Sequence, residues 1–94
     1  MYGLVFDLDT KVVERDYPRG TSQAYSDIRL TLEPFGFRKI QGSTYAADHE
    51  DFGKLFLAIT ALRKLSWFGS SLRNLRVFRM DQGTDVTSIM KTVN

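Results

Sequence analysis

Two carboxylates near the start of the chain, Asp7 and Asp9, have the type and spacing that could do chemistry. Read with the two-residue period of a strand, they share one face, while Leu4 and Phe6 lie on the other. Strands select against Asp, and desolvating a charge is costly. Such carboxylates could bind a divalent cation such as Mg²⁺, with Asp7 as a metal ligand, or one could act as general acid or base. Alternatively, the strand ends at Phe6 and residues 7–10 open a polar loop.

Side chains elsewhere in the chain have the chemistry to hold a phosphate group. Ser43 and Tyr45 could donate hydrogen bonds to it. Lys11, Arg15 and Arg19 lie in the polar stretch after the first strand and could contact a phosphodiester backbone. For each basic residue the alternative is an ordinary solvated charge. The sequence therefore makes these two hydroxyl residues and three basic residues candidates for a phosphate-binding site, with Asp7 as the candidate catalytic residue.

Composition excludes several classes of function. The chain has no cysteine, which excludes thiol catalysis, disulfides and thiolate metal sites, and its one histidine excludes a two-histidine metal site. It also lacks the glycine-rich motifs that cradle nucleotide phosphates. The net charge of +2 permits a nucleic-acid partner but does not require one. Without an apolar run of membrane-spanning length or a signal-peptide pattern, we expect a cytoplasmic protein with no membrane partner.

The periodicity predicts a strand at the N-terminus, over residues 2–8, and a long polar loop over 10–20. A helix should follow from Thr21 or Ser22, either of which could cap it, to about Glu33 before Pro34. Its apolar stripe has the spacing of one helix face and consists of Tyr25, Ile28, Leu32 and Phe35.

Two short strands, residues 37–41 and 43–47, are predicted next, joined by a tight turn around Gly42. A second helix should begin at an Asp48 cap, with Asp51 in a reciprocal position. Its expected apolar stripe repeats the spacing of the first helix and consists of Phe52, Leu55, Ile59 and Leu62, widened by Phe56. Residues 67–69 should then turn the chain.

Residues 72–80 alternate like a strand, although the spacing of Arg73, Arg76 and Arg79 leaves a helix open as an alternative. A short helix is expected at the C-terminus, capped by Thr84 or Asp85.

The predicted order β-α-β-β-α-β is that of an α+β, ferredoxin-like fold, with two helices on one face of a four-stranded antiparallel sheet in a single domain over residues 1–94. Right-handed crossovers would make the first and third strands the central pair, which brings the end of the first strand beside residues 43–45. Val5, with Phe78 or Val77 depending on register, would stay on the uncovered face. We therefore expect a homodimer through the sheet or its edge.

Six stretches over nearly the whole chain form one ordered pattern: residues 1–9, 24–29, 36–37, 41–45, 67–68 and 71–78. In order and spacing this pattern resembles the virulence-associated protein D family. The resemblance is weakest over residues 10–20 and in the C-terminal tail.

This resemblance implies a ferredoxin-like homodimer, similar in structure to the small endoribonuclease-like subunit of the CRISPR adaptation machinery. It further implies an RNA-cleaving toxin, in some members paired with a small antitoxin protein. The family's acidic residue at the end of the first strand corresponds to Asp7, and its Gln-Gly-Ser-x-Tyr hairpin contains Ser43 and Tyr45. Asp9 has no role that the resemblance transfers.

We therefore expect an endoribonuclease in which Asp7 activates the attacking group, directly or through a divalent cation. Ser43 and Tyr45 would act with it on the phosphate, and four basic residues would bind RNA: Lys11, Arg15, Arg19 and Arg76. The alternative is a non-catalytic dimeric scaffold that binds nucleic acid or another protein, in which these carboxylates are structural or inert.

Overall fold

A computed structural model describes residues 1–17 and 19–79 of the chain. Four antiparallel strands form one sheet in the order β2-β3-β1-β4. The strands are β1 (Tyr2–Leu8), β2 (Phe37–Gln41), β3 (Thr44–Ala47) and β4 (Leu72–Arg79). The predicted ferredoxin-like arrangement is confirmed, with β1 and β3 as the central pair.

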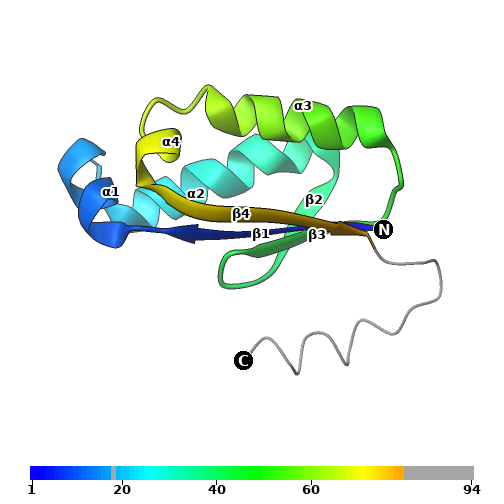
Figure 1. The fold of residues 1–94 in the computed structure, drawn as a ribbon, viewed down its shortest axis with the longest axis horizontal. Helices are drawn as coiled ribbons and strands as arrows, with labels where there is room; N and C mark the ends of the chain where they lie inside the picture. The colour runs from blue at the N-terminus through cyan, green and yellow to red at the C-terminus, as the bar shows by residue number, and fades with distance from the viewer. Residues whose placement is uncertain (18, 80–94) are drawn as a thin grey trace.

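Helices α2 (Thr21–Leu32) and α3 (Phe52–Arg63) lie side by side over one face of the sheet, as Figure 1 shows. The short α1 (Thr10–Asp16) follows β1 at one end of the sheet, a 3₁₀ turn η1 (Glu33–Phe35) ends α2, and α4 (Phe68–Ser71) leads into β4. No helix of the described residues covers the opposite face, which we call the open face.

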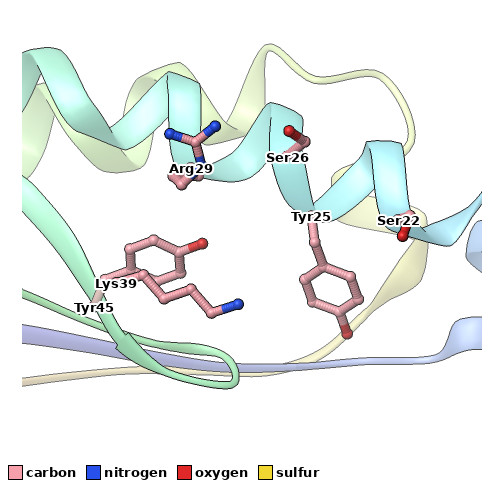
Figure 2. Close-up of a pocket in the computed structure, with 6 residues that line it drawn as sticks. All are labelled: Ser22, Tyr25, Ser26, Arg29, Lys39 and Tyr45. Carbon is pink, nitrogen blue, oxygen red and sulfur yellow. The ribbon is translucent and has the colours of Figure 1, made fainter.

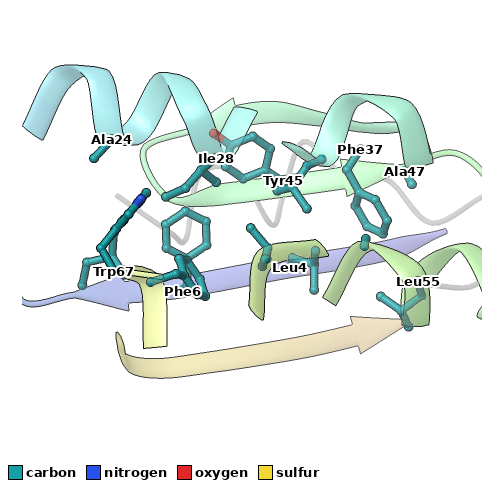
Figure 3. Close-up of a cluster of buried hydrophobic side chains, with 14 of the residues drawn as sticks. Leu4, Phe6, Ala24, Ile28, Phe37, Tyr45, Ala47, Leu55 and Trp67 are labelled. Carbon is teal, nitrogen blue, oxygen red and sulfur yellow. The ribbon is translucent and has the colours of Figure 1, made fainter. Parts of the chain in front are cut away.

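The core lies between the sheet and the helices, where the alternation of β1 places its apolar side chains. Leu4 is fully buried and Phe6 is 3% exposed, and the ring of Phe6 stacks on Tyr45 of β3 at 5.9 Å. Ile28 of α2 and Leu55 of α3 pack into the same cluster (Figure 3). The buried side of β1 is therefore the one that its two-residue period predicts.

The predicted loop over residues 10–20 is wrong, because its first part forms α1. Val13 and Tyr17 lie four residues apart, so one helical face buries both of them against the core. The edge of Tyr17 packs on Trp67 with ring centroids 5.0 Å apart. Tertiary packing thus stabilises a helix that is too short to be stable alone.

The predicted helix caps are also wrong. Helix α2 begins after Gly20, which has a positive φ and gives no side-chain cap, so neither Thr21 nor Ser22 caps it. Helix α3 is capped by Asp51, not Asp48, through a 3.1 Å hydrogen bond from the Lys54 amide. Asp48 instead forms an ion pair with Arg38 of β2 at 2.9 Å.

Helix α3 buries a narrower face than the predicted stripe. Leu55 and Leu62 are buried as expected, with Ala58 between them, whereas Phe52 and Phe56 are 67% and 61% exposed. Small Ala58 lets α3 pack closely, and the two aromatic residues fall outside that contact. The wider stripe was predicted from helical spacing, and the exposure of Phe52 and Phe56 contradicts it.

Strand β4 replaces the helix alternative and contains an irregularity that the alternation did not predict. Asp7 pairs with Asn74 but Leu8 pairs with Leu72, so Arg73 is an extra residue at this point. This β-bulge brings Leu72 to the same side of the sheet as Leu75, which the strict alternation had separated. The third strand begins one residue later than predicted, at Thr44.

Phe78 lies opposite Gly3 on the open face, which decides between the two predicted registers. A Cβ atom at Gly3 would lie 2.3 Å from the Phe78 ring, so glycine is needed for the ring to rest on β1. The predicted terminal helix and Met80 lie outside the described residues.

Candidate active site

Asp7 lies on the open face near the end of β1. It is exposed, and its side chain has no hydrogen bond or ion pair with the described residues. Asn74 is its direct neighbour on β4, and Arg76, opposite Val5, is its diagonal neighbour on the same face. These residues and Phe6 line a shallow pocket of about 200 Å³. A carboxylate, an amide and a guanidinium therefore meet at one accessible place.

Ser43 lies next to this place, as the predicted topology requires. Its carbonyl accepts a 3.2 Å hydrogen bond from the amide of Phe6, the residue before Asp7. The turn at Gly42, with a φ of 49°, brings Ser43 across from the end of β1. The structure thus brings Asp7 and Arg76 together and places the backbone of Ser43 beside the end of β1.

Tyr45 does not join them. It pairs with Leu4, whose side chain faces the helices, so Tyr45 and Asp7 point to opposite faces of the sheet. Burial raises the pKa of the Tyr45 hydroxyl above its ordinary value, and the nearby Arg29 opposes that shift. Tyr45 therefore belongs to a different part of the surface from Asp7.

Asp9 has a structural role, because both of its carboxylate oxygens accept hydrogen bonds from other residues of this chain. One carboxylate oxygen accepts hydrogen bonds from the amides of Lys11 and Val12 at 3.0 and 3.4 Å, which caps α1. The other accepts a 3.3 Å hydrogen bond from Arg73, the bulged residue of β4. Partial desolvation raises the pKa of Asp9, but the bonds from Arg73 and the two amides outweigh it, and the pKa lies below its ordinary value.

The predicted RNA-binding residues have different surroundings. Lys11 is exposed at the start of α1, and Arg15 is ion-paired with Asp16 at 2.8 Å. The hydrogen bond to Asp16 raises the pKa of Arg15. Arg19 is exposed near the hydrogen bond between Tyr17 and Asp27, and that bond raises the pKa of Tyr17 and lowers the pKa of Asp27. Only Arg76 of the four lies beside Asp7.

A larger pocket, which the sequence patterns did not predict, lies between α2 and the β2–β3 hairpin and has a volume of about 390 Å³. Its lining residues, drawn in Figure 2, are Ser22, Tyr25, Ser26, Arg29, Lys39 and Tyr45. Tyr25 packs against the core as its stripe predicts, but it is only half-buried and also lines this pocket. The spacing of residues 22, 25, 26 and 29 on one helical face was a signal that could have revealed this polar stripe.

The comparison with known proteins decides the family. No protein-family model matches the chain. A protein of Neisseria gonorrhoeae named "Endoribonuclease VapD homolog" is 48% identical over 92 residues, which are 98% of this chain and 100% of that protein. This chain belongs to the VapD family.

Two further VapD proteins are similar over almost their whole lengths. "Endoribonuclease VapD" of Haemophilus influenzae is 41% identical and covers 97% of this chain and 99% of its own. "Endoribonuclease VapD" of Helicobacter pylori is 34% identical and covers 98% and 100%. The predicted family resemblance is confirmed, and the matches include the weakly resembling residues 10–20.

A divalent cation does not fit the described residues of one copy of this chain well. The described residues contain no group of three His, Cys, Asp or Glu side chains that could hold a metal ion. The cationic Arg76 lies beside Asp7. The carboxylate oxygens of Asp9 already accept hydrogen bonds from the first turn of α1 and from Arg73. A cation at Asp7 would need oxygen ligands from elsewhere, such as RNA phosphates.

The described part of the chain also contains no helix that is both long and apolar enough to cross a membrane. The lone histidine, His49, has its two ring nitrogens engaged: Nε2 lies 2.7 Å from the Phe35 carbonyl, and Nδ1 accepts a 3.1 Å hydrogen bond from the Asp51 amide. It joins η1 to the start of α3 and is not near Asp7.

Proposed function

We propose that this protein is an endoribonuclease in which Asp7 is the catalytic residue. The observation that carries the proposal is the near full-length similarity to proteins named endoribonuclease VapD. The exposed position of Asp7 supports its role, because the carboxylate can reach a substrate without breaking an internal contact.

In the proposed mechanism, the Asp7 carboxylate accepts the proton of the attacking hydroxyl group or water as that oxygen bonds to phosphorus. The bond from phosphorus to the leaving ribose oxygen breaks, and that oxygen takes up a proton from solvent water. Arg76 neutralises charge that develops on the phosphate, and the Asn74 amide and Ser43 hydroxyl donate hydrogen bonds to its oxygens. Asp7, Asn74 and Arg76 line one pocket, and the backbone of Ser43 lies beside the end of β1, which supports their contact with one phosphate. This mechanism uses no metal ion, since the described residues of one copy contain no group of three His, Cys, Asp or Glu side chains that could hold one.

We propose that two copies associate through the open face or the sheet edge. Val5 and Phe78 lie on this face half-buried, with no described helix over them, and β2 and β4 are edge strands. Apolar area on an uncovered sheet face favours association with a second copy. A dimer can also bring two Asp7 carboxylates together, which would raise one pKa or provide a shared cation site.

We further propose that the protein is the toxin of a toxin–antitoxin pair and acts on RNA in the cytoplasm, with a small antitoxin protein as its partner. The family resemblance supports this proposal. Expression of the chain alone should halt growth, and co-expression of the product of an adjacent open reading frame should restore it. Growth unaffected by the chain alone would contradict the toxin role.

The test of the nuclease is cleavage of single-stranded RNA by wild type and Asp7→Asn, each purified by the same procedure and assayed with and without a chelator. We expect the variant to lose at least about 100-fold in rate, the lower range for general acid–base catalysis. Activity that survives the chelator supports the metal-free mechanism. Equal cleavage by both proteins would remove Asp7 from the reaction.

The second candidate is a non-catalytic dimeric scaffold. Its specific support is the open apolar face, which suits association without chemistry. A scaffold would bind RNA or protein without turnover and would be indifferent to Asp7→Asn.

A further inference from the structure

The pocket between α2 and the β2–β3 hairpin is built from three neighbouring elements of the chain, α2, β2 and β3. Helix α2 supplies Tyr25 and Arg29 from one stripe, and the hairpin supplies Lys39 and Tyr45, which are direct cross-strand partners. Figure 2 shows these side chains around one opening, with the Lys39 amine between the two tyrosines. The fold alone brings them together.

The pocket contains hydrogen-bond donors and cations but no carboxylate. Four hydroxyl groups and two cationic groups line it. Lys39 and the hydroxyls of Tyr25 and Tyr45 have no hydrogen-bond or ion-pair partner among the described residues. Arg29 has one, Glu33 at 3.8 Å, and both of these side chains are about half exposed. A surface ion pair of this kind is weak, so it leaves Arg29 able to bind an anion.

Such a set of groups suits a phosphate ester. Guanidinium, ammonium and hydroxyl groups are the usual partners of phosphate oxygens, and the tyrosine rings offer apolar surface beside them. The volume of about 390 Å³ falls within the range of small-molecule sites. A free anion would contact only the cationic groups of Arg29 and Lys39, whereas a nucleotide would contact these groups and also a tyrosine ring.

We propose that this pocket binds one nucleotide of the RNA substrate, with its phosphate on Arg29 and Lys39 and its nucleoside against Tyr25. The proposal rests on the proposed function, because it names a second contact of the same RNA. Asp7 lies on the other face of the sheet, so this subsite binds a nucleotide away from the cleaved bond. It positions the strand and takes no part in the chemistry.

The first experiment measures ligand binding without cleavage. Chemical shifts of the isotope-labelled protein are followed during titration with uridine 5′-monophosphate, uridine or inorganic phosphate. We expect shifts at Arg29, Lys39 and Tyr25, with the monophosphate binding more tightly than either part alone. Equal affinity for uridine and its monophosphate, or shifts confined to other residues, would overturn the proposal.

The second experiment measures affinity for a short single-stranded RNA in the Asp7→Asn background, which prevents cleavage. Arg29→Gln and Lys39→Gln should each weaken binding about tenfold, as expected for a charge-assisted hydrogen bond. Each should also lower the slope of log affinity against log salt by about 0.7, the value for one phosphate contact on a single strand. Lys64→Gln at the end of α3, an exposed cation outside the pocket, is the matched control and should change neither strongly.

Cleavage assays separate this proposal from the proposed function. With Asp7 intact, Arg29→Gln and Lys39→Gln should raise KM about tenfold and leave kcat near that of wild type. Normal KM in an active enzyme would overturn the pocket proposal alone. If the wild type cuts no RNA but the monophosphate still binds at Arg29 and Lys39, the nuclease proposal fails and the nucleotide site stands.

Discussion

Asp7 and Asp9 lie two residues apart, and their surroundings differ completely. Asp7 is exposed on the open face and has no partner among the described residues. Asp9 caps α1 and pairs with Arg73 across the bulge in β4. A carboxylate with all its interactions made internally stabilises the fold, whereas one held in place without them is available to a substrate. The difference separates structure from function within one short stretch.

The largest expected effect comes from making the same substitution at both positions. Asp7→Asn should lower the rate of RNA cleavage at least about 100-fold and leave the free energy of unfolding within about 0.5 kcal/mol of wild type. Asp9→Asn should retain cleavage near the wild-type rate, because asparagine still caps a helix. Cleavage rates and urea unfolding of the two proteins test this. Loss of cleavage in Asp9→Asn alone would reverse the assignment.

Removing the cap itself should cost stability. Asp9→Ala leaves the amides of Lys11 and Val12 without their acceptor, and the loss of an N-cap costs about 1 kcal/mol. For a domain of this size that corresponds to a midpoint lowered by about 4–8 °C. Asp9→Ser, which restores a capping oxygen, should recover most of the loss in thermal unfolding. If alanine and serine behave alike, the cap is not the origin of the effect.

A smaller effect should appear in the pH dependence of stability. The pKa of Asp9 is lowered by folding, so its charge stabilises the native state above the unfolded pKa of 3.8 and loses this effect as pH falls through the folded value. The stability difference between wild type and Asp9→Asn should therefore be constant near neutral pH and shrink below about pH 4. Glu50, Asp16 and Asp27 also have lowered pKa values, but they are the same in both proteins. A difference that grows in acid would contradict this sign.

The smallest effect should come from the ion pair. Arg73→Gln removes an exposed partner of Asp9, and such pairs contribute about 0–1 kcal/mol. Denaturant unfolding at low salt should show the loss, and at about 1 M salt, where screening is strong, the two proteins should agree. A loss that persists in high salt would mean that Arg73 stabilises the bulge by packing and not by charge.

Some parts of this comparison could be predicted from the sequence. The period of β1 correctly places Leu4 and Phe6 in the core and Asp7 on the other side. The role of Asp9 was missed because α1 was predicted as a loop, and a helix of seven residues gives too weak a pattern to recognise. Its stability depends on contacts of Val13 and Tyr17 with residues far along the chain.

Some of the candidate site residues could likewise be placed from the sequence, and others could not. Asp7 and Arg76 meet, with the backbone of Ser43 beside the end of β1, because the βαββαβ order determines which strands are neighbours, and that order can be predicted from local periodicity. Tyr45 could not be assigned to the correct face from sequence, because that depends on its register with Leu4. The exposure of Phe56 likewise depends on how closely α3 packs, which no pattern on one helix reveals.

The sequence by itself determined the family, the order of the main elements and the side of β1 on which Asp7 lies, since these follow from local period and from matched residues. The tertiary structure decided which polar groups have partners. Arg73, the bulged residue of β4, donates a hydrogen bond to Asp9. The pairing of Tyr45 with Leu4 buries Tyr45, and the packing of α2 over the hairpin places Lys39 at a pocket. The first two outcomes depend on contacts between segments distant in sequence, and the third depends on how neighbouring elements pack, so all three exist only once the chain has folded.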